Sequence, residues 1–550
     1  MATRNDQETI SRCTFCPAGC RIRLVPAGVD TWRVEYPKDA LSGLCPRGGA
    51  IGELLQHSGR IVWPLRRARG RGEPLSLDAC AREVVNRAAG GEILFLLDGN
   101  LPLEEIYAAA NCRAAWPAAR LCLVIEPADE QLLLGIEASG AEYLPSSELS
   151  GCDGFVVVGD AFAANPICAR GLLDRRYAEP RTPIVVIDPG AGTAWKFASH
   201  AIAAPPGGEY DALARLAAAA GLPVSPTGGQ DPTYAKAAAD AGRAIASCRR
   251  LGVLIAAEYG RNAAWRQIGH LAGRLAQAKG GAVAPQTIGA NALAAVRLGK
   301  SLGTMPLADA LGDDHGLRVV IGCDPLGMLG WCGEAGRKCR VAVAASALPN
   351  CTTEAAEFVL SLAMNGEMPG TYLFDNSRPE TIPALLPPPA GVPTPSELIA
   401  AFAREAGARV GAMEGPARPP DRSRPQAPEP PSVAAGPPGP VLLLARQARD
   451  HGCGSVTGHA SWQLAMTESA DLRFSADSAE ALGLESLQAI TVGADGAVLR
   501  GRVRIDPELP AGTVVFPEAV AARSLLPSRM DPRRSEIVSE PVSFPPECLT

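Results

Sequence analysis

Four cysteines near the N-terminus have the spacing of an iron–sulfur cluster site. Cys13, Cys16 and Cys20 form a C-x2-C-x3-C segment, and Cys45 follows after 24 further residues. A [4Fe–4S] cubane needs four thiolates on four irons, so one loop supplies three ligands and a later segment returns with the fourth. Four thiolates also suit Zn²⁺, although zinc sites favour paired short spacings. The pattern predicts a cluster, with zinc or a set of unrelated buried cysteines as the alternatives.

The elements that must position this motif alternate between strand and helix. The segments Asp129–Tyr143, Tyr210–Ala220 and Ala263–Lys279 have helical spacing, whereas short runs rich in Val, Ile and Leu suit strands buried on both faces. The predicted strands are Glu92–Leu97, Arg120–Ile125, Gly154–Val158, Pro183–Ile187, Gly252–Ala256, Leu317–Ile321 and Arg340–Ala344. This alternation predicts α/β units in which helices cover parallel sheets.

Length and composition divide the chain into four parts. A chain of 550 residues is too long for one core. Residues 1–65 are predicted to bind the cluster, 66–410 to form Rossmann-like α/β domains, and 441–550 to form a small β-rich domain. The proline-rich stretch 411–440 can join neither a helix nor an inner strand, so it is predicted to be an exposed linker.

The bulk composition narrows the class of function. Hydrophobic residues make up 47% and charged residues 20% of the chain, and the net charge is −6, so we expect a globular protein without a nucleic-acid-binding surface. No apolar stretch is long enough to span a membrane, and the N-terminus resembles no export signal. We therefore expect a cytoplasmic protein whose 16 cysteines are thiols or metal ligands rather than a disulfide framework.

The motif C-x2-C-x3-C-x24-C, followed by Arg60, Ile61 and Pro64, resembles the N-terminal cluster domain of the molybdenum/tungsten bis-molybdopterin oxidoreductases. Further segments are similar to this family in the same order along the chain: 155–160, 184–189, 320–326, 353–371 and 478–517. The resemblance implies an α/β multidomain molybdopterin-oxidoreductase scaffold. It has an N-terminal [4Fe–4S] cap, Rossmann-like parallel-sheet layers and a C-terminal β-barrel that resembles the molybdopterin-dinucleotide-binding domain.

The same resemblance assigns possible roles around a molybdenum or tungsten bis-molybdopterin guanine dinucleotide. Cys122 lies where a formate-dehydrogenase-like cysteine would ligate the metal. However, Leu123 stands where those enzymes have histidine, and a buried strand cysteine is the alternative. Gly159, Asp188 and Gly322 correspond to residues that face the pterin nucleotide. Yet the sequence departs from the family at several nucleotide-binding positions, which are Ala161, Gly190 and Glu209.

Arg47 occupies the position between cluster and pterin where formate dehydrogenases have lysine. An arginine there resembles the G subunit of NADH:quinone oxidoreductase, as does the segment Ala290-Asn-Ala292, but no ferredoxin-like domain precedes the motif in this sequence. The B subunit of formylmethanofuran dehydrogenase is a third similar protein. The geometry of arginine differs from that of lysine although the charge is the same.

These observations predict a redox subunit that relays electrons through one [4Fe–4S] cluster within a larger complex. A lone cluster needs a donor and an acceptor within tunnelling reach, so other redox subunits are expected partners. One alternative is an active molybdenum or tungsten enzyme that oxidises formate or a formyl group. Another is a non-redox scaffold in which the cluster only stabilises the N-terminal domain.

Overall fold

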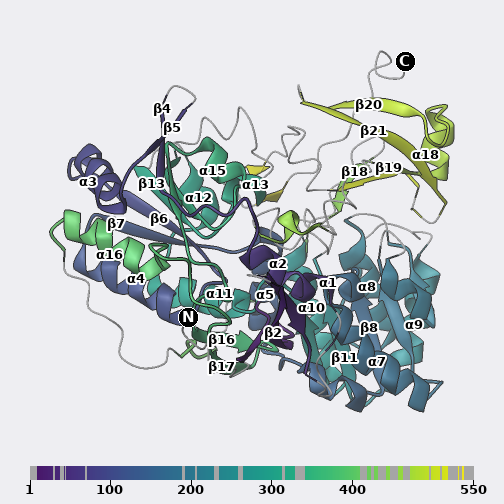
Figure 1. Ribbon diagram of the computed structural model, residues 1–550. Helices are drawn as coiled ribbons and strands as arrows, with labels where there is room; N and C mark the ends of the chain where they lie inside the picture. Colours follow the sequence, from purple (N-terminus) through teal and green to yellow (C-terminus); the bar gives the residue numbers. More distant parts are fainter. Residues whose placement is uncertain are drawn as a thin grey trace.

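The computed structural model contains two α/β units, an N-terminal unit between them and a C-terminal sheet (Figure 1). It describes residues 9–28, 31–37, 43, 45–68, 71–188, 192–204, 207–227, 234–257, 264–312, 316–328, 341–408, 418–422, 426–431, 441–445, 456–461, 471–494, 497–507, 509, 511–517, 530–531 and 536–537. Most of the predicted linker and the end of the chain lie outside these residues.

The larger sheet has the strand order β5-β4-β15-β14-β13-β6-β7. Its strands are β4 (Leu65–Ala68), β5 (Arg71–Pro74), β6 (Ile93–Asp98), β7 (Ala119–Val124), β13 (Leu317–Ile321), β14 (Val341–Ser346) and β15 (Phe358–Ser361). Five of them, from β15 to β7, are parallel, and the β4–β5 hairpin adds antiparallel strands at one edge. Strand β6 thus lies beside β13, although more than two hundred residues separate them in sequence.

The second sheet is entirely parallel, with the order β10-β9-β8-β11-β12. Its strands are β8 (Gly154–Val158), β9 (Ile184–Ile187), β10 (His200–Ile202), β11 (Leu251–Ile255) and β12 (Ala282–Pro285). All residues of β8, β9 and β11 are buried, as expected for strands with helices on both faces.

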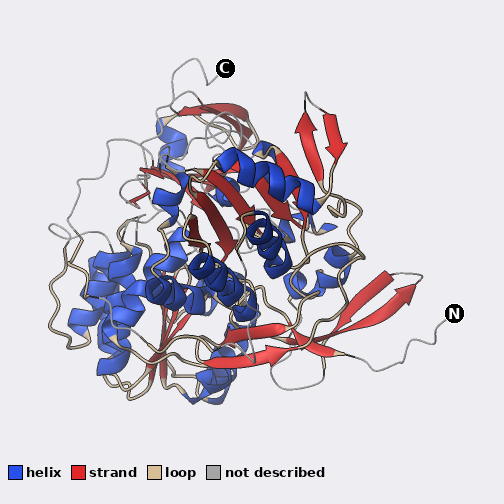
Figure 2. Ribbon diagram, turned by 90° about the vertical axis from the view of Figure 1, so that its left-hand side faces the viewer, coloured by secondary structure: helices blue, strands red, loops and turns tan. Residues whose placement is uncertain are grey.

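Helices cover both sheets (Figure 2). They are α3 (Leu77–Ala88), α4 (Leu103–Ala115), α5 (Pro127–Ser139), α6 (Ala161–Ala164), α7 (Pro166–Ala178), α8 (Glu209–Ala219), α9 (Ala235–Ile245), α10 (Trp265–Ala278), α11 (Ala292–Leu302), α12 (Leu307–Leu311), α13 (Pro325–Met328), α15 (Cys351–Ala355) and α16 (Pro395–Glu405). Ser76 and Thr394 cap α3 and α16 through side-chain oxygens, which satisfies free amides at the helix starts.

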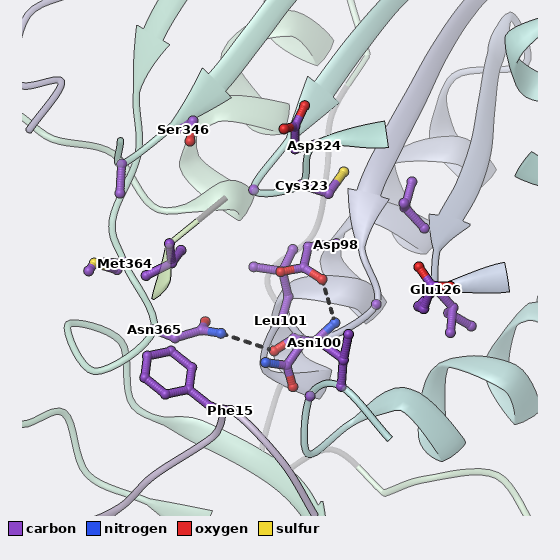
Figure 3. Close-up of a pocket in the computed structure, with 18 of the residues that line it drawn as sticks. Phe15, Asp98, Asn100, Leu101, Glu126, Cys323, Asp324, Ser346, Met364 and Asn365 are labelled. Atoms are coloured by element: carbon purple, nitrogen blue, oxygen red, sulfur yellow. Dashed lines mark hydrogen bonds between the residues drawn. The ribbon is translucent and has the colours of Figure 1, made fainter. Parts of the chain in front are cut away.

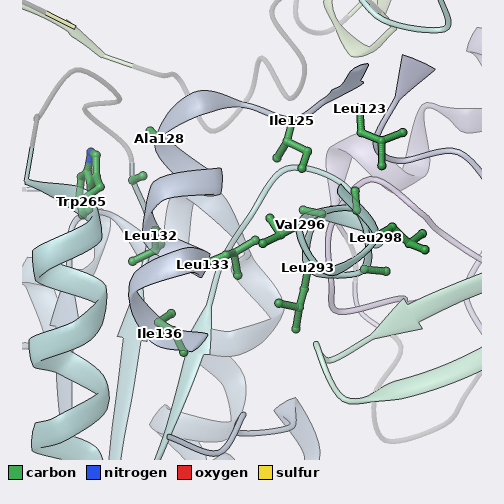
Figure 4. Close-up of a cluster of buried hydrophobic side chains, with 14 of the residues drawn as sticks. Leu123, Ile125, Ala128, Leu132, Leu133, Ile136, Trp265, Leu293, Val296 and Leu298 are labelled. Carbon is green, nitrogen blue, oxygen red and sulfur yellow. The ribbon is translucent and has the colours of Figure 1, made fainter. Parts of the chain in front are cut away.

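Helices α5 and α10 join the two α/β units into one core (Figure 4). Helix α5 follows β7 of the larger sheet, whereas α10 follows β11 of the second. A Cβ at Gly135 would lie 2.0 Å from Arg266 O, and one at Gly269 would lie 2.4 Å from Leu132 O. Glycine at both positions therefore lets the two helix backbones touch, while the leucines and isoleucines beside them fill the core.

The N-terminal unit consists of an antiparallel sheet, β1 (Ile10–Arg12), β2 (Arg21–Gly28) and β3 (Thr31–Glu35), with the short helices α1 (Pro46–Gly49) and α2 (Ile51–Leu55). The hairpin β16 (Gly370–Phe374) and β17 (Arg378–Ile382) packs against it. Arg12 Nε donates to Glu380 Oε1 at 2.8 Å and Ser11 Oγ donates to Pro383 O at 2.7 Å.

All seven predicted strands are present with bounds that differ by at most two residues, and the three predicted helices form α5, α8 and α10.

The C-terminal part contains one sheet, formed by β18 (Val441–Ala445), β19 (Asp471–Ser475), β20 (Ala489–Ala494), β21 (Ala497–Asp506) and β22 (Thr513–Pro517). Helix α18 (Ala476–Ala481) lies beside it, and β23 (Met530–Asp531) and β24 (Glu536–Ile537) form a separate short pair. A closed barrel there stays a prediction. Searching the described residues yields no helix with the length and apolar character that a membrane span requires.

Candidate functional site

The cysteine loop is closed by the strands on either side of it. Strands β1 and β2 pair antiparallel, and Cys13 N donates to Cys20 O at 2.8 Å where the loop begins and ends. Gly19 has φ +55°, in the left-handed region that favours glycine, and so reverses the chain just before Cys20. Cys45 comes from a separate segment and immediately precedes α1. The loop and this segment therefore approach each other from two directions.

The four motif cysteines line one small cavity. Its walls are Cys13, Phe15, Cys16, Cys20, Tyr36, Cys45, Arg47, Gly48, Asn165 and Ile167. None of the four cysteines is in a disulfide. Within the described part of the chain, no three His, Cys, Asp or Glu side chains lie close enough together to hold one metal ion. The structure thus brings the four predicted cysteines to the wall of one shared space.

Arg47 supplies a positive charge to the same cavity. Its side chain is buried, and Nη2 donates to the carbonyl oxygens of Ala164 at 2.6 Å and Ala163 at 3.2 Å. Those carbonyls belong to α6, so the guanidinium bridges the N-terminal unit and the second sheet. Nη1 is buried without a hydrogen-bond partner among the described residues. Such a buried donor favours an anionic or electron-rich group in the cavity.

Burial controls the protonation of the thiols when no metal is bound. Burial raises the pKa of Cys16 to about 11, an effect that Arg47 opposes and Cys45 reinforces, and burial raises the pKa of Cys20 to about 12. Burial and the other three cysteines raise the pKa of Cys13 as well. Without a metal, the thiols of Cys13, Cys16 and Cys20 are therefore neutral at pH 7. Iron binds the thiolate form, so ligation would release protons from this site.

Backbone amides from several elements hold the cysteine loop in place. Phe15 O accepts from Gly289 N at 2.9 Å, and Thr14 O accepts from Ala290 N and from Asn100 Nδ2, both at 3.0 Å. The turn of the β16–β17 hairpin adds a bond from Asp375 N to Pro17 O at 2.7 Å. The loop is thus fixed by segments that follow strands of both sheets, which limits its freedom before any metal binds.

The Gly19→Ala substitution is expected to disturb this loop strongly. A Cβ at Gly19 would lie 2.2 Å from Cδ1 of the buried Phe374, and the residue would remain at a positive φ. We expect a loss of about 2–4 kcal/mol of stability together with reduced iron content, because strain and overpacking act at the same point. Apparent unfolding temperature and iron analysis measure the two effects.

Gly407→Ala is the matched control for the positive φ. Gly407 has φ +74°, and a Cβ there would meet no atom within 4 Å. This variant should lose about 1 kcal/mol through backbone strain and keep its iron. Equal effects of the two substitutions on iron content would contradict the role of the Gly19 turn in the site.

A second, larger cavity adjoins the cysteine loop (Figure 3). It has a volume of about 90 Å³, and Phe15 lines both cavities. We call it the acidic chamber because Asp98, Glu126 and Asp324 are among its walls. The full lining is Phe15, Asp98, Gly99, Asn100, Leu101, Val124, Ile125, Glu126, Ile288, Gly289, Ala292, Gly322, Cys323, Asp324, Met328, Ser346, Ala347, Leu362, Ala363, Met364, Asn365 and Val456.

The topology of the larger sheet explains where the acidic chamber lies. Successive connections run from β6 outward to β7, and later from β13 outward through β14 to β15. The order therefore reverses between β6 and β13, and open α/β sheets bind ligands outside the carboxyl ends of the strands at such a point. Asp98 ends β6, while Gly322 and Cys323 follow β13. The chamber thus occupies the position that the fold itself makes available to a ligand.

Asp98 is a chamber residue whose pKa lies close to neutral pH. Burial raises its pKa to about 7, and a hydrogen bond from Asn100 N to Oδ1 at 2.9 Å opposes this shift. The neighbouring thiol of Cys323 and phenol of Tyr372 have raised pKa values and are neutral at this pH. A carboxyl that is about half protonated at pH 7 can donate or accept a proton.

The raised pKa predicts a pH-dependent effect of Asp98→Asn on stability. The folded protein holds this proton up to about pH 7, whereas the unfolded chain releases it near pH 4. Asp98 therefore destabilises the folded state increasingly as the pH rises from about 4 to 7, and by its full amount above that. We expect Asp98→Asn to gain about 2–4 kcal/mol relative to wild type between about pH 4 and pH 8. Denaturant unfolding at several pH values measures this.

The stability of Asp98→Asn must be compared with that of wild type at each pH, because other buried carboxyl groups also make stability depend on pH. Burial also raises the pKa values of Glu130 and Glu209 to about 7, and both shift wild type and variant equally. Asp309→Asn, on the exposed face of α12, serves as the control for removal of a surface carboxyl group. A constant offset between Asp98→Asn and wild type at all pH values would contradict the assignment.

The remaining predicted site residues occupy separate places. Cys122 is fully buried inside β7, packs in an apolar cluster and does not line the chamber. Gly322 lines the chamber, with φ +80°. Gly159, with φ +71°, and the buried Asp188 lie at the ends of β8 and β9 in the second sheet, and Asp188 Oδ2 accepts from Gly192 N at 3.3 Å. The metal-ligand and nucleotide-binding roles of these residues stay predictions.

Sequence reasoning does not single out Asp98, Asn100 or Cys323. A signal exists for the first two, because Asp98-Gly-Asn100 directly follows a buried strand, where ligand-binding residues of α/β units gather. In the sequence, Cys323 lies in the family-like segment 320–326 beside Gly322, but nothing there assigns a role to its thiol. Its place in the chamber depends on β13 lying beside β6, which the sequence does not reveal.

Comparisons with known proteins agree with this architecture. No protein-family model matches the chain. A nitrate reductase from Klebsiella oxytoca is 28% identical over an alignment of 219 residues, which covers 37% of this chain and 25% of that protein. The match thus spans about a quarter of the length of the nitrate reductase. The similarity lies below the level that would establish membership of one enzyme family.

A structural comparison covers nearly the whole chain. The structure of acetylene hydratase from Pelobacter acetylenicus matches with a TM-score of 0.65, covering 93% of this chain and 92% of that chain at 11% identity. The chain therefore has the fold of acetylene hydratase, which confirms the predicted mixed α/β class with parallel sheets. The cluster cap, the C-terminal barrel and the domain limits stay predictions.

Proposed function

We propose that this chain is an iron–sulfur redox protein on the molybdopterin-oxidoreductase scaffold, and that it relays electrons through one [4Fe–4S] cluster. Cys13, Cys16, Cys20 and Cys45 would hold the cluster. The observation that carries the proposal is that these four thiols, from two separate segments, line one cavity. The partial likeness to a nitrate reductase and the fold of acetylene hydratase support the scaffold.

The donor set fits a cluster better than a single ion. In a cubane each thiolate meets a different iron, so the four sulfur atoms stand further apart than around one Zn²⁺. Arg47 is suited to the negative charge of four thiolates, because its buried Nη1 lacks a partner among the described residues. A bound cluster supplies one-electron chemistry, while the chain fixes the ligands, provides the positive charge and excludes water.

Transfer of electrons requires neighbours, so we propose that the chain works with other redox subunits in a complex. Phe15, between the cysteine cavity and the acidic chamber, marks one side of the cluster site that a redox partner or bound group could approach. The protein environment would set the cluster potential through burial, amide hydrogen bonds and Arg47.

We propose a cytoplasmic location, which suits oxygen-sensitive thiolate ligation.

Metal and sulfide analysis of anaerobically purified protein tests the proposal. We expect about four irons and four inorganic sulfides per chain, and a reduced-state electron paramagnetic resonance signal that appears on chemical reduction. Zinc without sulfide would overturn the cluster. A cluster whose spectrum does not change over the accessible potentials would instead favour a structural scaffold.

The acidic chamber favours a second candidate, an active molybdenum or tungsten enzyme acting on formate or a formyl group. Its place at the topological switch point, beside the cysteine cavity, is suited to a cofactor that exchanges electrons with the cluster. The residues fit the pterin dinucleotide poorly, however. Among the described residues, the chamber wall has three carboxylates and no basic side chain for phosphates, and Cys122 does not line it. The same metal analysis discriminates, since one molybdenum or tungsten with released guanine nucleotide would favour the enzyme.

A further inference from the structure

The three carboxylates of the acidic chamber differ in the hydrogen bonds that they accept from neighbouring helices. Asp324 accepts from Thr352 Oγ1 at 2.6 Å, from Thr352 N at 2.9 Å, and from Gly327 N and Cys351 N at 3.2 and 3.3 Å. It thereby fixes the starts of α13 and α15. Glu126 caps α5 by accepting from Ala128 N at 3.4 Å. Both residues thus have structural tasks at the wall.

Asp98 is different, because its carboxyl group faces the open space. Figure 3 shows it near the middle of the chamber, between Cys323 and Asn100. Its hydrogen bond from Asn100 N engages Oδ1. A carboxylate in a cavity with so few donors is poorly solvated, and a ligand that brings N–H groups or positive charge relieves this.

The rest of the wall supports the same electrostatic preference. No lysine, arginine or histidine occurs among the described residues that line the chamber. Asn365 Nδ2 donates to Asn100 O at 3.4 Å, so both side chains border the space beside Asp98. The apolar lining from Leu101, Val124, Ile125 and Leu362 surrounds this polar end. Low polarity around a carboxylate strengthens its attraction for a cation and its repulsion of an anion.

We propose that the acidic chamber is a binding site for a small organic cation of the amidine or ammonium type, with Asp98 as the residue that selects it. The cavity volume of about 90 Å³ suits an organic molecule of a few non-hydrogen atoms, such as an amidinium ion. One or two N–H groups of the ligand would donate to Asp98, and its carbon skeleton would contact the apolar wall. Carboxylates and oxyanions are excluded by the three acidic side chains. The inference is independent of whether the cysteine cavity holds a cluster.

Three isosteric probes test the selectivity on the intact, anaerobically purified protein. Acetamidinium, acetamide and acetate have nearly the same shape and carry charges of about +1, 0 and −1. At about pH 8, where Asp98 is ionised, saturation-transfer nuclear magnetic resonance should give affinities that fall in this order. We expect acetamidinium to bind at least about tenfold more tightly than acetate.

Asp98→Asn keeps the size of the side chain and removes its charge. We expect it to weaken acetamidinium binding at least about tenfold and to change acetamide binding by less than about threefold. The exposed Asp309→Asn serves as the control and should bind all three probes like wild type. Equal binding of acetate and acetamidinium, or an unchanged preference in Asp98→Asn, would overturn the proposal. Absence of any probe binding would also overturn it, since the chamber would then be filled or closed.

Iron content, measured on the same samples, separates this inference from the proposed redox function. Asp98→Asn should retain the iron of wild type, because Asp98 lies outside the cysteine cavity. Wild-type protein that lacks iron and sulfide but still prefers acetamidinium to acetate would count against the cluster proposal alone. Probe binding that fails while iron and sulfide are present would count against the chamber proposal alone.

Discussion

Cys16→Ser is expected to lower the iron content from about four to three or fewer per chain and to abolish the wild-type cluster spectrum. Cys16 lies in the middle of the loop, and its thiol lines the same cavity as the other three. Serine preserves the size of the side chain, but its hydroxyl is a much poorer ligand for iron than a thiolate. Because the cluster would connect the loop to the segment at Cys45, the apparent unfolding temperature should fall as well.

Cys168→Ser provides a sharp control for this substitution. Burial raises the pKa of the Cys168 thiol, and the nearby Cys16 adds to this shift, yet Cys168 does not line the cavity. Its thiol donates to Asn165 O at 2.9 Å, a bond that a serine hydroxyl can replace. We expect unchanged iron and an unchanged spectrum. Equal iron loss in both variants, or full iron retention in Cys16→Ser, would contradict the assignment of the four ligands.

The strands could be predicted because short apolar runs in the local sequence indicate their burial. Gly154–Val158 and Leu317–Ile321 have the predicted bounds, since a short run of β-branched and aliphatic residues ended by glycine favours a buried strand over a helix. Arg340–Ala344 was less accurate, and β14 continues to Ser346. Small residues such as Ala345 and Ser346 carry a weak strand signal, and it is packing against β13 and β15 that extends the strand there.

The candidate site divides in the same way between local and distant information. That the four cysteines share one cavity could be predicted, because their spacing lies within 33 residues of chain, from Cys13 to Cys45. The acidic chamber could not, because it exists only where β6 lies beside β13. The contact of Gly19 with Phe374 likewise depends on the β16–β17 hairpin reaching the loop. Pairings between distant segments arise from the tertiary fold, and a single sequence does not display them.

Glu367→Gln is expected to destabilise the protein by about 3–5 kcal/mol, because it breaks a buried ion pair and leaves one charge behind. Arg60 Nη1 and Nη2 donate to Glu367 Oε1 and Oε2 at 2.8 and 2.9 Å, and the two side chains are 6% and 3% exposed. Glu367 Oε2 also accepts from Met364 N at 2.7 Å. The pair joins the segment after α2 to the turn before β16.

Glutamine is nearly isosteric with glutamate, so the effect of Glu367→Gln reports the lost charge rather than lost volume. The double variant Arg60→Met/Glu367→Leu removes both charges and should recover most of the stability, since well-packed apolar residues often replace buried ion pairs without loss. Apparent unfolding midpoints in denaturant measure the series, with iron content as a second readout. If Glu367→Gln were as stable as wild type, or if the double variant were less stable than the single one, the unpaired buried charge would not be the main cause of the destabilisation. Recovery in the double variant would instead show that the unpaired charge causes the destabilisation. It would also show that the site of the ion pair tolerates apolar side chains.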